Sequence, residues 1–431
     1  MGCGCTIHFP EAIDLEEWLN VMEQIAKDRW EGKLKKGELS DAYILQTYKE
    51  LNGALSDGFG ADNFKVNKAT GKIPIEALQM QRNLFKFSGA KNYVVLENIN
   101  QILTSYKGKN WNVFKNEVLK INPKYNKNYL QAEWQTAKQA GYHAANWQEY
   151  QNNKGLYPNL KYQTQKDNKV RDAHQTLNGI IAPIDSDFWK THYPPNGWRC
   201  RCYVVQTAEP PTQGDLPVLT DKEFPKEFRG NVGISGEIFK ETDENKGKPH
   251  PYFALSKQWG SETKKAFEYS KLAAPYTKIY EAKNGAEIKV SPFADESDLQ
   301  KNVQTAVVIA DELGVGVNIR PHLDLHKHKN PEYEINKNIA DRKEVSSYTS
   351  IKSNLESAKK QGNSSIVYDI TNFKNWEANE ILRYLKGKII SFNDKKWLKE
   401  IFFVNGGKAI SFTREELIND FDNVFKRFNK L

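Results

Sequence analysis

The chain has little of several residue types whose abundance would define its class. Only 4 of its 431 residues are cysteines, and they form two tight pairs, Cys3-Gly-Cys5 and Cys200-Arg-Cys202. This is a poor disulfide framework for so long a chain, so we expect reduced thiols or a metal. No apolar run approaches the ~18 residues of a membrane span, and no secretory signal is recognisable at the N-terminus. We therefore expect a protein made in a cytoplasm, without a membrane partner.

Neither sign of charge dominates the composition. The formal net charge of +8 permits an anionic partner but does not require one. With 39% hydrophobic and 27% charged residues the composition is that of a globular protein. At ~150 residues per domain, the length indicates two or three domains.

The N-terminal part of the chain has helical spacing. Apolar residues recur three and four apart over 12–60, 84–105 and 111–152, and glycines in the run 57–60 end the first of these stretches. We expect the stripe of small and aromatic residues in the last stretch to form a helix-on-helix core. Its members are Tyr129, Trp134, Ala137, Ala140, Ala144 and Trp147.

After residue 155 the pattern changes twice. Short segments broken by Pro, Gly and Asn continue through 156–255, followed by a helix and a linker over 256–285. From 286 to 431 helical and extended patterns alternate, with a helix closed by Gly314, a hairpin at 333–343, a helix over 348–361 and a strand at 366–370. The predicted fold class is multidomain α+β: a mostly helical region at 1–155, an irregular module at 156–255, and a small α+β domain at 286–431.

The irregular module contains a possible metal site. Thiolate and imidazole suit zinc, and His174, Cys200 and Cys202 are three candidate ligands for its tetrahedral site. His192, or the N-terminal Cys3 and Cys5, could supply the fourth. In the alternative interpretation, His174 pairs with the backbone or Asp172, and both cysteines of the motif are merely buried.

The spaced motif around these residues resembles that of the phage Mu F-like head morphogenesis family of minor capsid proteins. Its residues are Arg171, His174, Leu177, Gly179, Phe188, Trp189, Pro194, Pro195, Gly197, Trp198, Cys200, Arg201 and Cys202. Flanking segments extend the resemblance over roughly 15–255. It implies a virion protein, made in the cytoplasm of a bacterial host, present in few copies and partnered by portal and capsid proteins. It implies no catalytic activity.

A second set of polar residues lies in the C-terminal domain. Glu332 precedes one strand of the expected hairpin, and Asp341 and Lys343 lie two apart on the other strand, so their side chains share a face. Carboxylates there could bind Mg²⁺ or Zn²⁺ as catalytic ligands, and the lysine could polarise a phosphate. Gln361, at the end of the following helix, completes the candidate catalytic set.

The order of these elements resembles the PD-(D/E)xK nucleases, and 330–369 is similar to the C-terminal tRNase domains of contact-dependent inhibition and other polymorphic toxins. That resemblance implies RNA (tRNA) as substrate and an immunity protein as partner. Glu332 replaces the usual aspartate. Related toxin nucleases use metal-free chemistry instead, for which His322, His326 and His328 are the candidates. Residues 286–431 hold 23 Lys and Arg against 21 Asp and Glu, so charge alone does not indicate RNA.

The sequence therefore supports two hypotheses. In one, a phage or prophage minor head protein carries a C-terminal ribonuclease toxin domain. In the other, the chain is purely structural, and its C-terminal domain binds a partner protein or DNA without catalysis.

Overall fold

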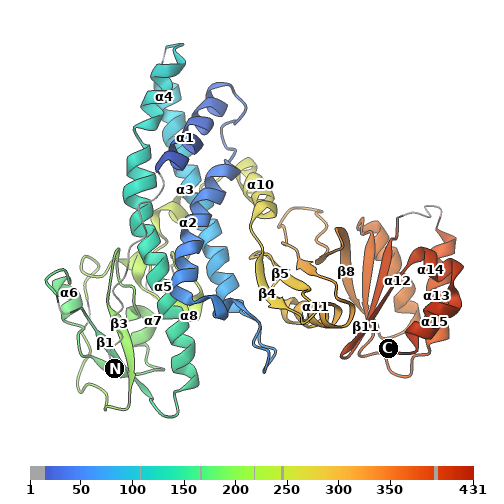
Figure 1. Ribbon diagram of the computed structural model, residues 1–431. Coiled ribbons are helices and arrows are strands. Elements are labelled where there is room, and N and C mark those ends of the chain that lie inside the picture. The colour runs from blue at the N-terminus through green and yellow to red at the C-terminus, as the bar shows by residue number, and fades with distance from the viewer. Residues whose placement is uncertain (1–14, 107, 166, 218, 244–246, 393–396) are drawn as a thin grey trace. The chain divides into compact units, whose positions relative to one another are not determined.

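The computed structural model describes residues 15–106, 108–165, 167–217, 219–243, 247–392 and 397–431 (Figure 1). They divide into two compact units. Unit 1 takes the described residues up to Asn63 and those of Gln79–Ala273, whereas unit 2 takes Phe64–Leu78 and Ala274–Leu431. The first is mostly helical and the second mixes helices with a large sheet, which confirms the predicted α+β class. None of the helices in the described ranges is both long enough and apolar enough to cross a membrane.

Long helices dominate the first half of unit 1. They are α1 (Leu15–Trp30), α2 (Asp41–Phe59), α3 (Ile75–Ser105), α4 (Trp111–Leu119) and α5 (Leu130–Asn152), with short turns η1 (Ala61–Phe64) and η2 (Pro123–Tyr129). The helical spacing expected over 111–152 is interrupted at η2, a π-helical turn that begins at Pro123. Proline has no backbone N–H to donate, so a regular α-helix does not continue through it.

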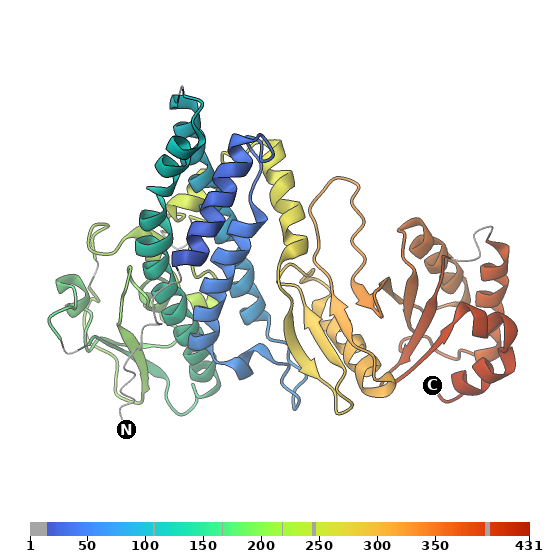
Figure 2. The same cartoon turned by 45° about the horizontal axis from the view of Figure 1, so that its top comes forward.

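Helices α2 and α5 pack closely side by side in both views (Figures 1 and 2). Glycine makes this approach possible. A Cβ atom at Gly58 would lie 1.9 Å from the carbonyl oxygen of Lys138, and one at Gly141 would lie 2.8 Å from that of Leu55. Gly58 thus serves helix packing and lies inside α2, whereas Gly60, with φ of 87°, ends the helix. Ala137, Ala140 and Ala144 of α5 are buried as the stripe predicted, whereas Tyr129 is exposed.

The rest of unit 1 contains short elements around a small antiparallel sheet of order β2-β1-β3. Its strands are β1 (Asn159–Gln163), β2 (Ile181–Pro183) and β3 (Tyr203–Thr207). The short helices are α6 (Asp172–Gln175), α7 (Phe188–His192), η3 (Lys226–Phe228), α8 (Val232–Ser235), α9 (Pro251–Ser256), α10 (Ser261–Ser270) and η5 (Lys271–Ala273). A buried cluster joins Trp147 of α5 to this sheet and includes both Cys200 and Cys202.

Unit 2 is built on an eight-stranded mixed sheet of order β11-β10-β9-β8-β7-β6-β5-β4. The strands are β4 (Thr277–Glu281), β5 (Glu287–Val290), β6 (Val317–Ile319), β7 (Tyr333–Ile335), β8 (Asn338–Glu344), β9 (Ser365–Asp369), β10 (Glu400–Asn405) and β11 (Lys408–Thr413). The helices are α11 (Leu299–Leu313), α12 (Tyr348–Lys360), α13 (Ala378–Ser391), α14 (Arg414–Asn419) and α15 (Phe421–Phe428). Strands β8, β9 and β10 are parallel, and β7 and β8 form the expected hairpin.

Two hydrophobic cores cover the two faces of this sheet. On β9, Val367 belongs to the core of α11, whereas its neighbours Ile366 and Tyr368 belong to the core of α12 and α13. Successive side chains of a strand point to opposite faces, so this alternation separates the two cores. We expected a linker after residue 272, but strand β4 lies there and pairs with β5.

Candidate functional site

In unit 1 the structure brings His174, Cys200 and Cys202 together. His174 lies on α6, shortly after β1, and the cysteines directly precede β3. Since β1 and β3 are paired from Asn159↔Thr207 to Gln163↔Tyr203, the segments at this end of the two strands come together. The ligand atoms of the three residues lie within 4.8 Å of one another, and all three residues are buried.

The imidazole points at both sulfur atoms. Nδ1 of His174 lies 3.7 Å from Sγ of Cys200 and 3.5 Å from Sγ of Cys202, and the two cysteines are free thiols. A hydrogen bond from Cys202, followed by the proximity of His174, lowers the pKa of Cys200 well below the usual thiol value, although burial opposes the shift. The hydrogen bond to Cys200, together with burial, raises the pKa of Cys202. A buried His/Cys group with one readily ionised thiol is suited to a metal ion.

Among the described residues, neither Asp172 nor His192 belongs to the metal-ligand group. Asp172 is exposed, and no hydrogen bond joins its side chain to His174 among the described residues. His192 stacks on Phe188 and its Nδ1 lies 2.7 Å from Oγ1 of Thr191, so it is outside the group. Cys3 and Cys5 lie outside the described residues. The structure thus supplies three candidate metal ligands here.

In unit 2 the Asp-x-Lys residues share one face of β8, as the two-residue spacing predicted. Asp341 is 2% exposed, and its Oδ2 forms an ion pair with Nζ of Lys343. The other oxygen, Oδ1, is buried and has no hydrogen-bond partner among the described residues. Burial raises the pKa of Asp341, whereas Lys343 opposes the shift. A buried carboxylate oxygen without a partner is costly, which makes Asp341 a candidate ligand for a cation.

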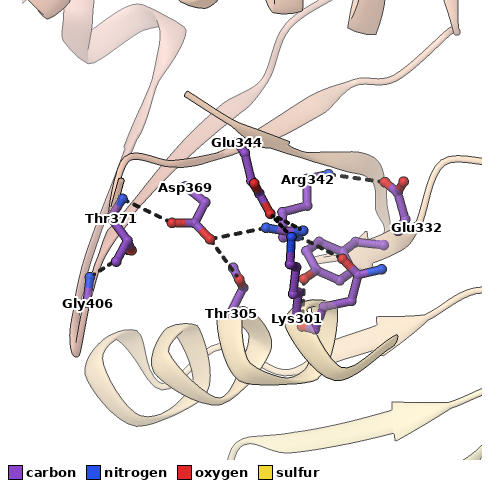
Figure 3. Close-up of polar contacts among 10 residues, drawn as sticks. Lys301, Thr305, Glu332, Arg342, Glu344, Asp369, Thr371 and Gly406 are labelled. Atoms are coloured by element: carbon purple, nitrogen blue, oxygen red, sulfur yellow. Dashed lines mark hydrogen bonds and ion pairs between the residues drawn. The ribbon is translucent and has the colours of Figure 1, made fainter. Parts of the chain in front are cut away.

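Glu332 lies next to this pair, at the edge of the β7–β8 hairpin. Tyr333 is paired with Ala340, and the antiparallel register continued by one residue places Glu332 opposite Asp341. Oε2 of Glu332 accepts a hydrogen bond of 3.2 Å from the backbone N–H of Arg342 (Figure 3). Gln361, in contrast, follows α12 and accepts a hydrogen bond of 3.2 Å from Asn363. Within the described part of the chain, no hydrogen bond joins Gln361 to the other three candidates.

Arg342, between Asp341 and Lys343, was not singled out from the sequence. Its guanidinium lies on the opposite face of β8, where it donates to Asn302 at 2.8 Å and forms ion pairs with Asp369 and Glu344 at 3.1 Å each (Figure 3). Asp369 also accepts from the backbone N–H of Thr371 at 3.1 Å. The alternation of side chains along a strand could have identified Arg342, because it places the residue between Asp341 and Lys343 on the other face of the strand.

The three histidines considered for metal-free catalysis lie on the loop between β6 and β7. His326 and His328 are exposed, and Nδ1 of His322 lies 3.6 Å from Oδ2 of Asp295. Leu323 and Asn330 exchange two hydrogen bonds of 3.0 Å and so close the loop beneath its tip. No hydrogen bond or ion pair joins these histidines to Asp341 or Lys343 among the described residues.

Comparison with known proteins identifies relatives of the middle of the chain. Residues 96–205 match the family described as phage Mu protein F like protein. A protein named for capsid assembly, protein F of Escherichia phage Mu, is 39% identical over 103 residues, which are 23% of this chain and 24% of that protein. The Mu-like prophage FluMu F protein of Haemophilus influenzae is 38% identical over 74 residues, which are 17% of this chain and 18% of that protein.

The chain thus spans about a quarter or less of the length of these relatives. The matched segment contains His174, Cys200 and Cys202, so the comparisons support the resemblance to phage Mu F-like proteins over 96–205. Among solved structures, a CdiA-CT/CdiI toxin and immunity complex from Burkholderia pseudomallei is 20% identical, with 28% of this chain and 91% of that chain covered and a TM-score of 0.21. Structural similarity at this level does not indicate a shared function.

Proposed function

We propose that this chain is a minor head protein of a phage or prophage, and that its second unit is a metal-dependent ribonuclease of the toxin type. The head role rests on the Mu F-like segment, whose motif residues lie together around the β2-β1-β3 sheet. Portal and capsid proteins are the partners that this role requires, and the virion is where the chain would be found.

The nuclease role rests on the unpaired Oδ1 of Asp341 beside Lys343 and Glu332. A divalent cation, Mg²⁺ or Zn²⁺, would find the carboxylate of Asp341 on β8 opposite Glu332, which directly precedes β7. It would stabilise charge that develops on a phosphate during cleavage, while the ammonium group of Lys343 would add a second positive charge. We propose tRNA as the substrate class and an immunity protein as the partner that protects the producing cell.

Cleavage of total tRNA by the purified full-length chain tests the nuclease role. We expect cleavage with Mg²⁺ or Zn²⁺, none with a chelator, and loss of at least about a hundredfold in rate for Asp341→Asn and Lys343→Met. The chain offers a matched control, because Glu287 and Lys289 form a half-buried pair with the same spacing on β5, 2.7 Å apart. Glu287→Gln and Lys289→Met should leave the rate unchanged.

A folded chain that cleaves no RNA with any metal would instead support the structural alternative. In that case Asp341 and Lys343 are an ion pair within the sheet, and unit 2 binds a partner protein or DNA. The near-complete burial of Asp341 is the observation that favours this second candidate.

For unit 1 we propose zinc as the metal bound by His174, Cys200 and Cys202, because two thiolates and an imidazole suit that ion. Elemental analysis of the full-length chain should find one zinc per chain. His174→Ala, Cys200→Ser and Cys202→Ser should each remove it.

A further inference from the structure

The group of His174, Cys200 and Cys202 is buried, but a hollow lies against it. The space in and just outside the hollow amounts to about 240 Å³, part of it open to solvent, and all three candidate ligands line it. Its other lining residues are Lys169, Val170, Arg171, Arg199 and Arg201. A metal ion held by the three ligands would therefore have one side facing this hollow.

Among the described residues, the site has one ligand fewer than a closed zinc site needs. Structural zinc sites have four protein ligands, whereas sites with three keep the fourth position for an exchangeable ligand. His143 does not belong to the metal-ligand group, although its Nε2 lies 3.1 Å from the carbonyl oxygen of Cys202. Among the described residues, the metal-ligand group contains three members.

The charge around the hollow favours an anion at the fourth position. Two thiolates balance the charge of one Zn²⁺, so the metal centre itself would be neutral. Arg201 is paired with Asp167 through two contacts of 2.6 and 2.8 Å. The remaining three cations of the lining, Lys169, Arg171 and Arg199, form no ion pair among the described residues. Arg171 donates to the carbonyl oxygen of Trp198 at 2.6 Å, which fixes its guanidinium in place.

We infer that the metal centre of unit 1 keeps its fourth coordination position open to this hollow, where it takes a hydroxide or a small anion from solvent. The inference rests on the zinc proposal above. Lys169, Arg171 and Arg199 supply the positive potential that favours an anion over a neutral ligand. The centre is then a binding site for an exchangeable ligand rather than a closed structural cross-link.

Cobalt substitution of the full-length chain tests this inference, with sodium azide as the probe anion. Co²⁺ bound to thiolates absorbs in the visible range, and the spectrum changes when a ligand exchanges. We expect a saturable spectral change on azide titration. Arg199→Gln should weaken azide binding by roughly two- to tenfold through the loss of one charge, whereas the matched variant Arg199→Lys should retain it.

Failure of this inference and failure of the zinc proposal give different results. Absence of metal from the purified chain overturns both. Metal that is bound, with a spectrum that azide does not change, overturns the open position but leaves the zinc proposal intact. A double variant Cys3→Ser/Cys5→Ser that loses metal shows that the N-terminal cysteines supply the fourth ligand, which also overturns the open position. Metal retained in that variant, with azide binding unchanged, supports the inference.

Discussion

At the scale of single residues, alternation along β8 accounts for most of what the sequence could predict. Two-residue spacing correctly placed Asp341 and Lys343 on one face of a strand. It could not show that Asp341 is almost fully buried or that one of its oxygens lacks a partner, because burial depends on α12 and β9, which lie further along the chain. The ion pairs of Arg342 were equally hidden, since Asp369 is separated from it by a whole helix.

Asp341→Asn should separate stability from activity. Burial raises the pKa of Asp341 more than Lys343 lowers it, so the ionised carboxylate is unfavourable in the folded chain. An amide of the same shape removes that charge but leaves the ammonium group of Lys343 without its ion-pair partner, so we expect the thermal unfolding temperature of unit 2 to change by less than roughly 4 °C while RNA cleavage is lost. Calorimetry and the cleavage assay on the same preparation measure both effects. A variant that is less stable and equally active would contradict this account of the site.

At the scale of elements, helical spacing predicted the helices well, but not their contacts. The glycines in the run 57–60 were interpreted as a helix end, which is correct for Gly60 only. Gly58 is required for a different reason, the close approach of α5, and no local pattern reveals a helix that packs against it from another part of the sequence. Strand β4 was not predicted from the sequence. It is held by hydrogen bonds to β5, across a turn, and this pairing is not visible in the local pattern of β4 itself.

Gly58→Ala should destabilise unit 1, against the usual preference for alanine in helices. The new Cβ would lie 1.9 Å from the carbonyl oxygen of Lys138, so α2 and α5 must separate, at a cost of about 1–3 kcal/mol. Gly53 lies on the same helix with open space around it, and Gly53→Ala should instead stabilise by about 0.5–1 kcal/mol. Urea unfolding, monitored by tryptophan fluorescence, gives the free energy of unfolding of both variants. Equal effects of both substitutions would show that the α2–α5 contact is looser than described.

The N-cap of α9 should make unit 1 sensitive to acid. Nδ1 of His250 accepts a hydrogen bond of 3.2 Å from the backbone N–H of Tyr252, and burial, with Lys91 nearby, lowers the pKa of His250 to about 3. Because the pKa of His250 is lower in the folded chain, the free energy of unfolding falls as the pH drops below the unfolded-state pKa of about 6.5. This decrease continues down to about pH 3. The expected slope from this residue is about 1.4 kcal/mol per pH unit.

His250→Asn keeps an acceptor at the cap but cannot titrate in this range. The variant should therefore lose less stability than the natural chain between pH 6.5 and pH 4, when both are unfolded in urea at each pH. If the free energy of unfolding falls equally with pH in the two proteins, His250 is not the source of the acid sensitivity.

At the scale of the whole molecule, the division into units could not be predicted from local patterns. Residues 64–78 belong to unit 2 although they precede most of unit 1 in the sequence. The backbone N–H of Val66 donates to the carbonyl oxygen of Ile279 in β4 at 2.8 Å, and Val66 and Ile73 join the core beneath α11. A composition change marks a boundary along the chain, but it carries no information about a segment that returns to a distant unit.

Ile73→Ala should consequently weaken unit 2 rather than the helices near it in sequence. Loss of a buried isoleucine side chain costs about 2–4 kcal/mol, and we expect faster hydrogen exchange in β4 and β5 with little change in α5. Hydrogen exchange read by mass spectrometry on the full-length chain resolves these segments. Faster exchange confined to α2 and α5 would contradict the assignment of 64–78 to unit 2.

We propose that one chain joins a head protein segment to a nuclease unit. The most direct measurement is quantitative mass spectrometry of purified phage particles, with peptides from 96–205 and from 338–369 counted separately. We predict both sets of peptides in equal amounts, at a few copies of the chain per particle. Particles that lack the chain, or that contain the first segment without the second, would contradict the claim.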